Sequence, residues 1–162
     1  MFSIGDKIVY PMHGAGVVEG IEEKQILGES RSYYILKVPF GDMKIMIPCD
    51  STESVGVREV ICVAEIPVVE EALSSESTEM PGNWNRRYRD NMEKLKTGDL
   101  EQVCEVVRNL MRVDQIKKLS TGEKKMLSNA RQILLSELIL VCNRNADEIN
   151  VFIDGLVFGK GA

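Results

Sequence analysis

Histidine is almost missing from this sequence: His13 is the only one in 162 residues. A catalytic triad, a Cys–His pair or a histidine-based metal site could therefore be built only around His13. This residue lies in the glycine-rich segment YPMHGAG (10–16), which is typical of a turn. Walker, H-E-x-x-H and EF-hand motifs are absent, and GAGVVEG (14–20) lacks the spacing of a dinucleotide-binding loop. We predict a protein that is not an enzyme and has no metal, cofactor or small-molecule substrate; an enzyme centred on His13 is the alternative.

Cysteine and long apolar runs are also scarce. The four cysteines, Cys49, Cys62, Cys104 and Cys142, never form the C-x-x-C spacing of zinc or redox sites, and their apolar neighbours predict reduced, buried thiols. No apolar run reaches the roughly 18 residues that a bilayer-spanning helix needs. The segment MFSIGDKIVYP (1–11) lacks the basic and apolar parts of a signal peptide. We therefore expect a cytoplasmic protein with no membrane partner.

Basic residues are outnumbered overall, and they are unevenly distributed. The formal net charge is -5. Residues 1–82 contain six Lys and Arg against fourteen Asp and Glu, residues 83–144 contain thirteen against eight, and residues 145–162 contain one against three. An acidic first half with a basic middle is expected when one part of a chain binds a polyanion. A solvated helix surface with a small local excess of charge is the alternative explanation.

Residues 5–48 have the pattern of short β strands. Val, Ile and Tyr fill segments that are separated by glycines, and a turn is expected at Gly41-Asp42. Four or five strands in about 50 residues, joined by short turns, predict a small Tudor-like or SH3-like β barrel. We place this domain at residues 1–55. Its expected strands are DKIVY, GVVEGIEEK, SYYILKVPF and MKIMIP.

The pattern becomes helical after the last of these strands. AEIPVVEEALSS (64–75) predicts a short helix, and SSESTEMPG (74–82) predicts a loop. From Trp84 the helical spacing continues to the end, with Gly98 as the first stop. We place an all-α helical bundle at residues 56–162, which makes the fold class α+β. Capping boxes are expected at the next three helix starts, from Asp99 with Gln102, Ser120 with Glu123 and Asn145 with Glu148.

The stretch SVGVREVICV (54–63) joins the two regions. Its part VREVICV is ambiguous in secondary structure. The stretch as a whole is too apolar for a free linker, because a free linker would leave these apolar side chains in contact with water. We therefore expect the two domains to pack against each other.

The only tryptophan, Trp84, lies in PGNWNRRYRDN (81–91), next to three arginines. A helix that begins there places Trp84 on one stripe with Tyr88, Met92 and Leu95, which predicts a core position. Its place in the first turn after a Pro-Gly loop favours the opposite, because a side chain there can project past the end of a bundle. A helix N-terminus beside arginines attracts phosphate, and an exposed aromatic ring can wedge between bases. The residues alone leave core and nucleic-acid wedge equally open.

Four segments, in order along nearly the whole chain, resemble the CarD family of bacterial transcription regulators, also called CdnL. They are GDKIVYPMHGAGVVEGIE, VPFGDMKIMIP, NWNRRYRDNMEKLKTGD and LSTGEKKMLSNARQILLSEL. The first segment alone is also similar to the polymerase-interaction module of the transcription-repair coupling factor. The helical segments select the CarD family, and the helicase motifs of a coupling factor are absent.

The resemblance implies a regulator with two binding domains. CarD-like proteins bind the β subunit of RNA polymerase through a Tudor-like N-terminal domain, and promoter DNA through a helical C-terminal domain. The family's tryptophan, which wedges into the minor groove at the upstream edge of the transcription bubble, matches Trp84. Basic DNA contacts are implied at Arg86, Arg87, Arg89, Lys124 and Lys125.

On the polymerase side, the resemblance points to Lys24, Lys44 and Met46. Two arginines of the family align with Lys24, which keeps the charge, and with Met46, which does not. The contact near Met46 would then rest on strand pairing and apolar packing along MKIMIP (43–48).

The implied function is a non-catalytic regulator that stabilises the open promoter complex. A wedge that fits only opened DNA shifts the equilibrium toward the open state, and the shape of the DNA would set most of its preference. The alternative is a protein–protein adaptor without DNA contact, in which Trp84 is core.

Overall fold

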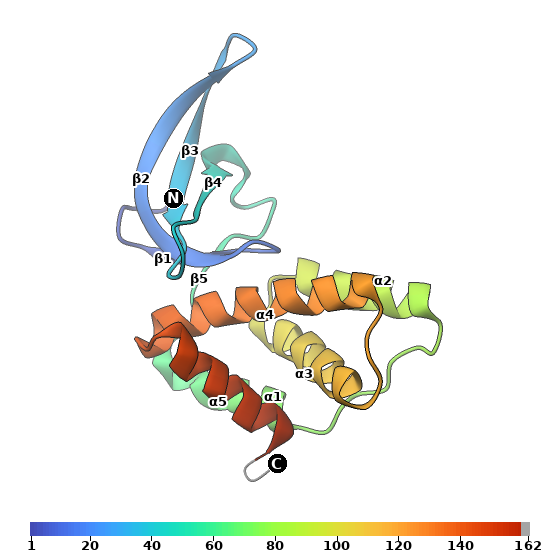
Figure 1. The fold of residues 1–162 in the computed structure, drawn as a ribbon. Helices are drawn as coiled ribbons and strands as arrows, with labels where there is room; N and C mark the ends of the chain where they lie inside the picture. Colours follow the sequence, from blue (N-terminus) through green and yellow to red (C-terminus); the bar gives the residue numbers. More distant parts are fainter. Residues whose placement is uncertain (160–162) are drawn as a thin grey trace.

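The computed structural model describes residues 1–159 and shows an antiparallel sheet standing on a group of helices (Figure 1). The predicted order, with a β domain followed by a helical domain in the α+β class, is confirmed. The domain boundary at residue 55 stays a prediction. Residues 160–162 of the predicted helical domain lie outside the described residues.

The sheet has the strand order β4-β3-β2-β1-β5, and every neighbouring pair is antiparallel. All four strand segments that the sequence predicted are confirmed. The ambiguous stretch VREVICV contains the short fifth strand, which pairs with β1. The strands are β1 Lys7–Tyr10, β2 Gly14–Ile26, β3 Glu29–Lys37, β4 Lys44–Pro48 and β5 Arg58–Glu59.

One face of the sheet is covered by its own small apolar core. Residues paired across neighbouring strands point to the same face of a sheet. The register pairs Val18 with Leu36 and Tyr34 with Ile47, so that all four side chains meet on one face, together with Ile8. Each of these five is at most 3% exposed.

Closure of the sheet into the predicted barrel is not observed in residues 1–159. β4 and β5 are the two edges, and no strand pairing joins them. A barrel needs every strand to continue the hydrogen-bond ladder around the axis. With two residues, β5 is too short to do so. One edge of β4 is therefore left without a strand partner in the described structure.

The helical domain contains five α-helices within the described residues. The short helix and the loop predicted around residues 64–82 are confirmed. No helix among residues 1–159 is long and apolar enough to cross a membrane. The bounds are α1 Ile66–Ser74, α2 Trp84–Lys96, α3 Leu100–Ile116, α4 Thr121–Cys142 and α5 Ala146–Phe158.

The starts of these helices follow the predictions in part. The capping box predicted at the start of α5 is confirmed. At the start of α4, the Ser120 hydroxyl accepts a hydrogen bond from the Glu123 backbone N–H at 3.3 Å. The Glu123 carboxylate binds Arg87 and the Ser120 hydroxyl, and not the Ser120 backbone N–H that a capping box requires. Asp99 does precede α3, yet its side chain makes no capping hydrogen bond. The capping box predicted there with Gln102 is wrong.

A second and larger core lies between α1, α3, α4 and α5, and α2 contributes Leu95 to it. Figure 1 shows α3 crossing the middle of this domain under α4. Leu110, Leu134 and Leu138 are fully buried, and burial of each such side chain favours folding by about 1.5–3 kcal/mol. The helical domain thus has a core of its own, separate from that of the sheet.

The thiol prediction is only partly right. Cys104 is fully buried, and burial raises the pKa of its thiol. Cys49 and Cys142 are half-buried, whereas Cys62 is exposed, so the prediction that all four are buried is wrong. Cys62 lies in the segment that joins the domains, and its side chain stays at the surface although the neighbouring Ile61 packs against the helical core.

The close approach of β2 to β3 requires a glycine at position 16. A Cβ atom there would lie 2.5 Å from the carbonyl oxygen of Lys37. We predict that Gly16→Ala lowers the free energy of unfolding by about 1–3 kcal/mol, because backbone must shift to admit the methyl group. Urea unfolding measures this loss. Gly20→Ala, in the same strand but with nothing within 4 Å of the new atom, is the matched control, and an equal loss in both variants would contradict the explanation.

Candidate functional site

Trp84 is the first residue of α2 and lies at the surface. Its side chain is 45% exposed. The stripe predicted for α2 is present, but it rises out of the core: Leu95 is buried, Met92 and Tyr88 are half-buried, and Trp84 is exposed. The interpretation of Trp84 as a core residue is therefore wrong.

Three contacts fix the exposed indole in one orientation. Its Nε1–H donates to the Ser120 hydroxyl at 2.8 Å, and its ring stacks on Tyr88 with 5.7 Å between the centroids. Gly122 lies close by, since a Cβ atom there would come 3.5 Å from the Cζ2 atom of Trp84. The indole is held against α4 although it is open to solvent. An aromatic ring that is already ordered loses little conformational entropy when a ligand stacks on it.

Arg87, one of the predicted DNA contacts, forms a bidentate ion pair with Glu123 of α4. Both nitrogen–oxygen distances are 2.7 Å, and the Glu123 side chain is 2% exposed. Hydrogen bonds from Arg87 hold the pKa of the Glu123 carboxyl below its ordinary value of 4.5, against the opposing effect of burial. The Arg87 charge is thus already paired within the protein. The contact of Arg87 with DNA stays a prediction.

The other predicted DNA contacts, Arg86, Arg89, Lys124 and Lys125, are all exposed. None of these four forms an ion pair with a carboxylate of the described chain, residues 1–159. The first turn of α2 is capped by Asn83, and helix N-termini carry a partial positive charge. The structure therefore places unpaired positive charge on α2 and the first turns of α4, the two elements that also hold the indole.

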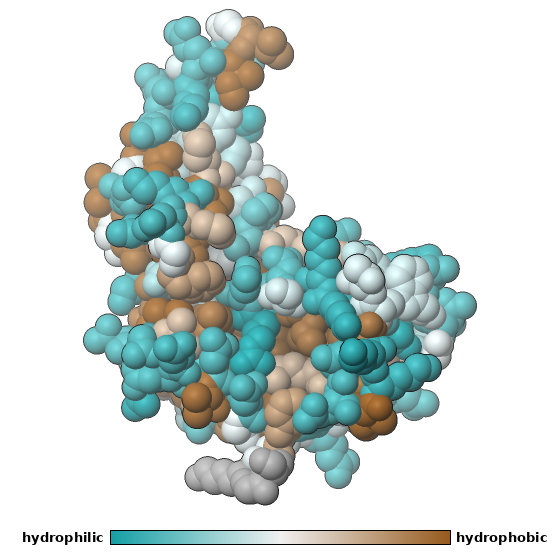
Figure 2. Space-filling view, viewed as in Figure 1, coloured by the Kyte–Doolittle hydropathy of each residue, from teal (hydrophilic) through white to brown (hydrophobic). Residues whose placement is uncertain are grey.

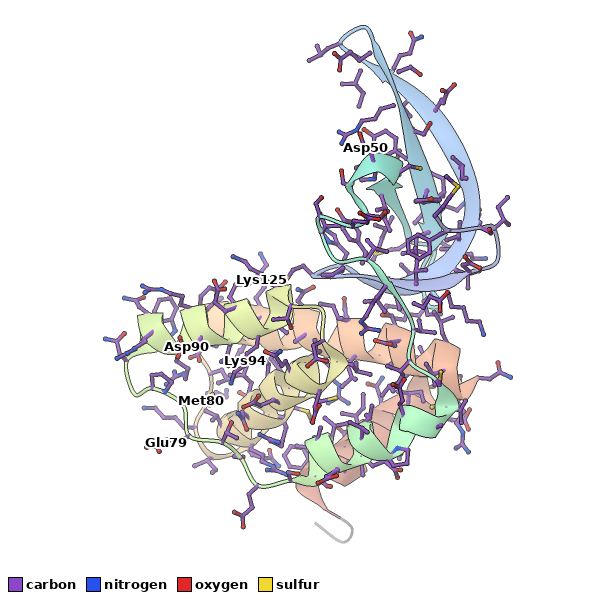
Figure 3. All side chains as sticks on the ribbon, turned by 180° about the vertical axis from the view of Figure 1, so that it is seen from behind. Asp50, Glu79, Met80, Asp90, Lys94 and Lys125 are labelled. Atoms are coloured by element: carbon purple, nitrogen blue, oxygen red, sulfur yellow. The ribbon has the colours of Figure 1, made fainter. Side chains whose placement is uncertain are left out.

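The figures place this surface on the molecule. The end of the helical domain where α2 begins is covered mainly by hydrophilic side chains around a patch of intermediate hydropathy (Figure 2). In Figure 3, Lys125 lies on the edge of the helical domain nearer to the sheet, whereas Asp90 and Lys94 lie on the other side of α2. The acidic side chain is thus kept away from the edge on which Lys125 lies.

A hollow of about 450 Å³ adjoins the indole, and sequence reasoning missed most of its lining. Trp84 forms part of its wall, with Ser120 and Glu123 beside it. The connection between α3 and α4 adds Lys117 and Lys118, which are exposed. The only signal for these two lysines was their place just before the predicted cap of α4. That signal does not show that α2 and this connection meet.

The predicted polymerase contacts lie on one face of the sheet. The register pairs Lys24 with Arg31, and it pairs Met46 with Ile35; Lys44 is two residues before Met46. Lys24, Lys44 and Met46 therefore share the face opposite the sheet core. Met46 is 36% exposed, and the Lys44 ammonium binds Glu19 at 2.7 Å. The sequence placed these residues on two strands; the register places them on one surface.

The tip of the β2–β3 hairpin carries exposed apolar side chains that sequence reasoning did not single out. Ile26 is 52% exposed, and Leu27 is fully exposed. Leu27 and Gly28 both have positive φ, 52° and 82°, as the tight two-residue turn of a hairpin requires. A leucine in this conformation is unusual. In Figure 2 hydrophobic side chains are visible at this projecting end of the sheet.

The described residues offer no metal centre and no catalytic constellation. No group of three or more His, Cys, Asp or Glu side chains in residues 1–159 is arranged to hold a metal ion. His13 is exposed in the predicted turn, stacked on Tyr10, and its Nδ1 lies 3.1 Å from the carbonyl oxygen of Pro11.

Comparison with known families gives the class of the protein. The model of the CarD-like/TRCF RID domain matches residues 2–61, and the model of the CarD C-terminal domain matches residues 68–154. The first match identifies an RNA polymerase-interaction domain, and the pair defines a CarD-like transcription factor. This chain belongs to the CarD family, whose members are non-catalytic.

One relative that matches nearly the whole chain agrees with this assignment. "Putative transcription factor YdeB" of Bacillus subtilis (strain 168) is 40% identical over 152 residues, which are 94% of this chain and 99% of the relative. The solution structure of the 72-residue N-terminal domain of Myxococcus xanthus CarD is 25% identical, with a TM-score of 0.32, and covers 36% of this chain and 79% of that one. The CdnLNt structure from the same organism is 46% identical, with a TM-score of 0.33, and covers 38% and 86% respectively.

The exposure of Trp84 can be measured by fluorescence, because Trp84 is the only tryptophan in the sequence. We expect red-shifted indole emission and efficient quenching by iodide in the native protein. Ser120→Ala should increase the fast local motion of the indole in time-resolved anisotropy, since it removes the bond to Nε1, while Ser128→Ala, elsewhere on the exposed side of α4, should not. Blue-shifted emission that iodide does not quench would contradict the position of Trp84.

The Arg87–Glu123 pair predicts a pH-dependent stability. The pKa of Glu123 is lower in the folded than in the unfolded state, so its contribution is complete above about pH 4.5 and is lost as the pH falls through the folded value. At pH 7, Glu123→Gln should lower the free energy of unfolding by about 2–3 kcal/mol. The difference from the wild type should shrink in urea titrations between pH 5 and pH 3. A difference that does not change over this range would contradict the prediction.

Proposed function

We propose that the protein stabilises the open promoter complex by binding RNA polymerase through the sheet and promoter DNA through the start of α2. The observation that carries the proposal is Trp84: an indole that is 45% exposed, fixed by Ser120 and Tyr88, and flanked by unpaired basic side chains. Placed at the upstream edge of the transcription bubble, this ring would wedge into the minor groove. A transcription factor of this kind acts where the polymerase is, in the cytoplasm of a bacterium.

The physical basis is a difference in affinity between closed and open DNA. Insertion of a side chain between stacked bases costs about a few kcal/mol. At the edge of an opened bubble the polymerase has already separated the bases, so the same insertion costs less. A factor that binds the open state better than the closed state shifts the equilibrium toward it by that difference.

The basic side chains have different roles in this proposal. Arg86, Arg89, Lys124 and Lys125 contact phosphates on either side of the indole, independently of base sequence. Arg87 mainly fixes α2 to α4, because its Nε and Nη2 atoms bind Glu123; only Nη1 lies outside this pair and could donate to a DNA phosphate. A few phosphate contacts give weak, salt-sensitive binding to free DNA, so most of the affinity at the promoter comes from tethering to the polymerase.

The polymerase contact is proposed to combine backbone and side-chain interactions. The free edge of β4 can accept a strand of the β subunit, as other sheet edges accept extended peptides. Lys24 supplies charge on the outer face, and Met46 supplies apolar contact where an arginine of the family is missing. Because Met46 is uncharged, the polymerase contact should depend less on salt concentration than it would with two charged residues at positions 24 and 46.

The lifetime of the open complex tests this function. With purified polymerase on a promoter fragment, the wild-type protein should prolong the lifetime, and Trp84→Ala should remove most of the gain. Loss of one aromatic stacking contact is worth about 1–3 kcal/mol, or roughly a 5- to 150-fold change. Polymerase binding by Trp84→Ala should be unchanged.

The matched control is Val151→Ala, which truncates another exposed apolar side chain, on α5. It should leave the lifetime at the wild-type value. If Trp84→Ala is as effective as the wild type while Val151→Ala behaves normally, the DNA wedge is excluded, and the adaptor without DNA contact becomes the better explanation.

A further inference from the structure

A nearly buried ion pair connects the two domains. Arg58 lies in β5, at one edge of the sheet, and its guanidinium donates two parallel hydrogen bonds of 2.8 Å to the Glu137 carboxylate in the C-terminal part of α4. Glu137 is 1% exposed. The Arg58 side chain is 29% exposed, so it is mainly the helical domain, around Glu137, that shields the pair from solvent. Its two members are 79 residues apart in the chain.

The pair is the centre of a larger polar contact. The backbone N–H of Ile61 donates to the same Glu137 carboxylate at 2.9 Å. The Nε atom of Arg58 donates to the carbonyl oxygen of Gly98, at the connection between α2 and α3, at 3.0 Å. A single carboxylate on α4 thus binds both β5 and the segment that follows it, and the same arginine reaches the end of α2.

Close packing surrounds this contact. Ser136, next to Glu137, accepts a hydrogen bond of 2.8 Å from the backbone N–H of Ala15 in β2. A Cβ atom at Gly98 would lie 2.8 Å from Pro11, so the two domains approach each other here as closely as glycine allows. Met12 also packs against the core of the helical domain. The expectation that the domains pack is confirmed.

We propose that Arg58 and Glu137 are positioning residues that set the angle between the polymerase-binding face of the sheet and the exposed indole. The inference rests on the proposed function. Each domain has its own apolar core, so loss of the pair changes how the domains are oriented more than whether they fold. A bidentate pair of a planar guanidinium with a carboxylate constrains direction as well as distance.

Orientation matters because the protein must reach two sites at once. When two binding surfaces are joined rigidly at the right geometry, the second contact forms at a high effective concentration, and that advantage is lost when the geometry is wrong. Neither Arg58 nor Glu137 is part of the proposed DNA or polymerase surface. Their effect on the open complex therefore runs only through the relative placement of the two surfaces.

The test variant is the double substitution Arg58→Met/Glu137→Gln. It removes both charges together, so that no unpaired charge is left buried, and such replacements are tolerated far better than single ones. Asp154→Asn is the matched control, because it breaks an ion pair with Arg131 that joins α4 to α5 within one domain. Ser136→Ala is the second test variant, since it weakens the same domain contact without touching a charge.

Two measurements are made on each full-length protein. Residual dipolar couplings of backbone amides report the orientation of the sheet relative to the helices. We expect one alignment tensor to fit both domains in the wild type and in Asp154→Asn, and two different tensors to be needed in the double variant. Open-complex lifetimes should show the double variant keeping less than about a third of the wild-type gain, because the effective concentration has fallen.

The outcomes separate the two proposals. If the wild type prolongs the lifetime and the double variant matches it in both couplings and lifetime, the positioning role is excluded while the proposed function stands. Changed couplings with an unchanged lifetime also exclude it. If the wild type has no effect on lifetime, the proposed function fails, and the couplings alone decide whether the pair sets the orientation. If the double variant does not fold, Ser136→Ala is judged by the same criteria.

Discussion

The organisation of this protein depends on two nearly buried carboxylates of one helix. Glu123 and Glu137 both lie on α4, and each binds an arginine from another element through two hydrogen bonds: Arg87 of α2 and Arg58 of β5. The two glutamates are fourteen residues apart, close to four turns, so they lie on nearly the same side of the helix about 21 Å apart. α4 acts as a strut. Its first turn binds the helix that carries the exposed indole, and its C-terminal part binds the sheet.

This arrangement explains why a chain of net charge -5 can carry a basic surface. Glu123, the carboxylate that lines the hollow beside the indole, is paired with Arg87, whereas Arg86, Arg89, Lys124 and Lys125 form no ion pair within residues 1–159. The indole itself is ordered by Ser120, which also caps α4. Cap, ion pair and aromatic stack thus form one connected unit at the junction of α2 and α4, and a change in any part of it affects the surface.

Sequence patterns predicted the local features of the fold, and not its long-range contacts. Strands, helices, the loop before α2 and the cap of α5 depend on residues a few positions apart, and they were found. The partners of Arg87 and Arg58 are 36 and 79 residues away, and periodicity has no information about them. The same holds for the two lysines beside the indole and for the unclosed sheet. The sequence left the position of Trp84 open because its stripe is apolar along α2, whereas its exposure depends on where α4 begins, at Ser120 and Thr121.

The unclosed sheet has one more consequence, for self-association. A free strand edge is a template on which a second copy of the chain could add its own strand, and such contacts lead to aggregation. β4 is only five residues long, it begins with Lys44, and it ends with Pro48, which has no backbone N–H to donate. These features allow one short, specific partner strand and oppose indefinite stacking. The same five residues that leave an edge available for a partner therefore also protect the chain from its own copies.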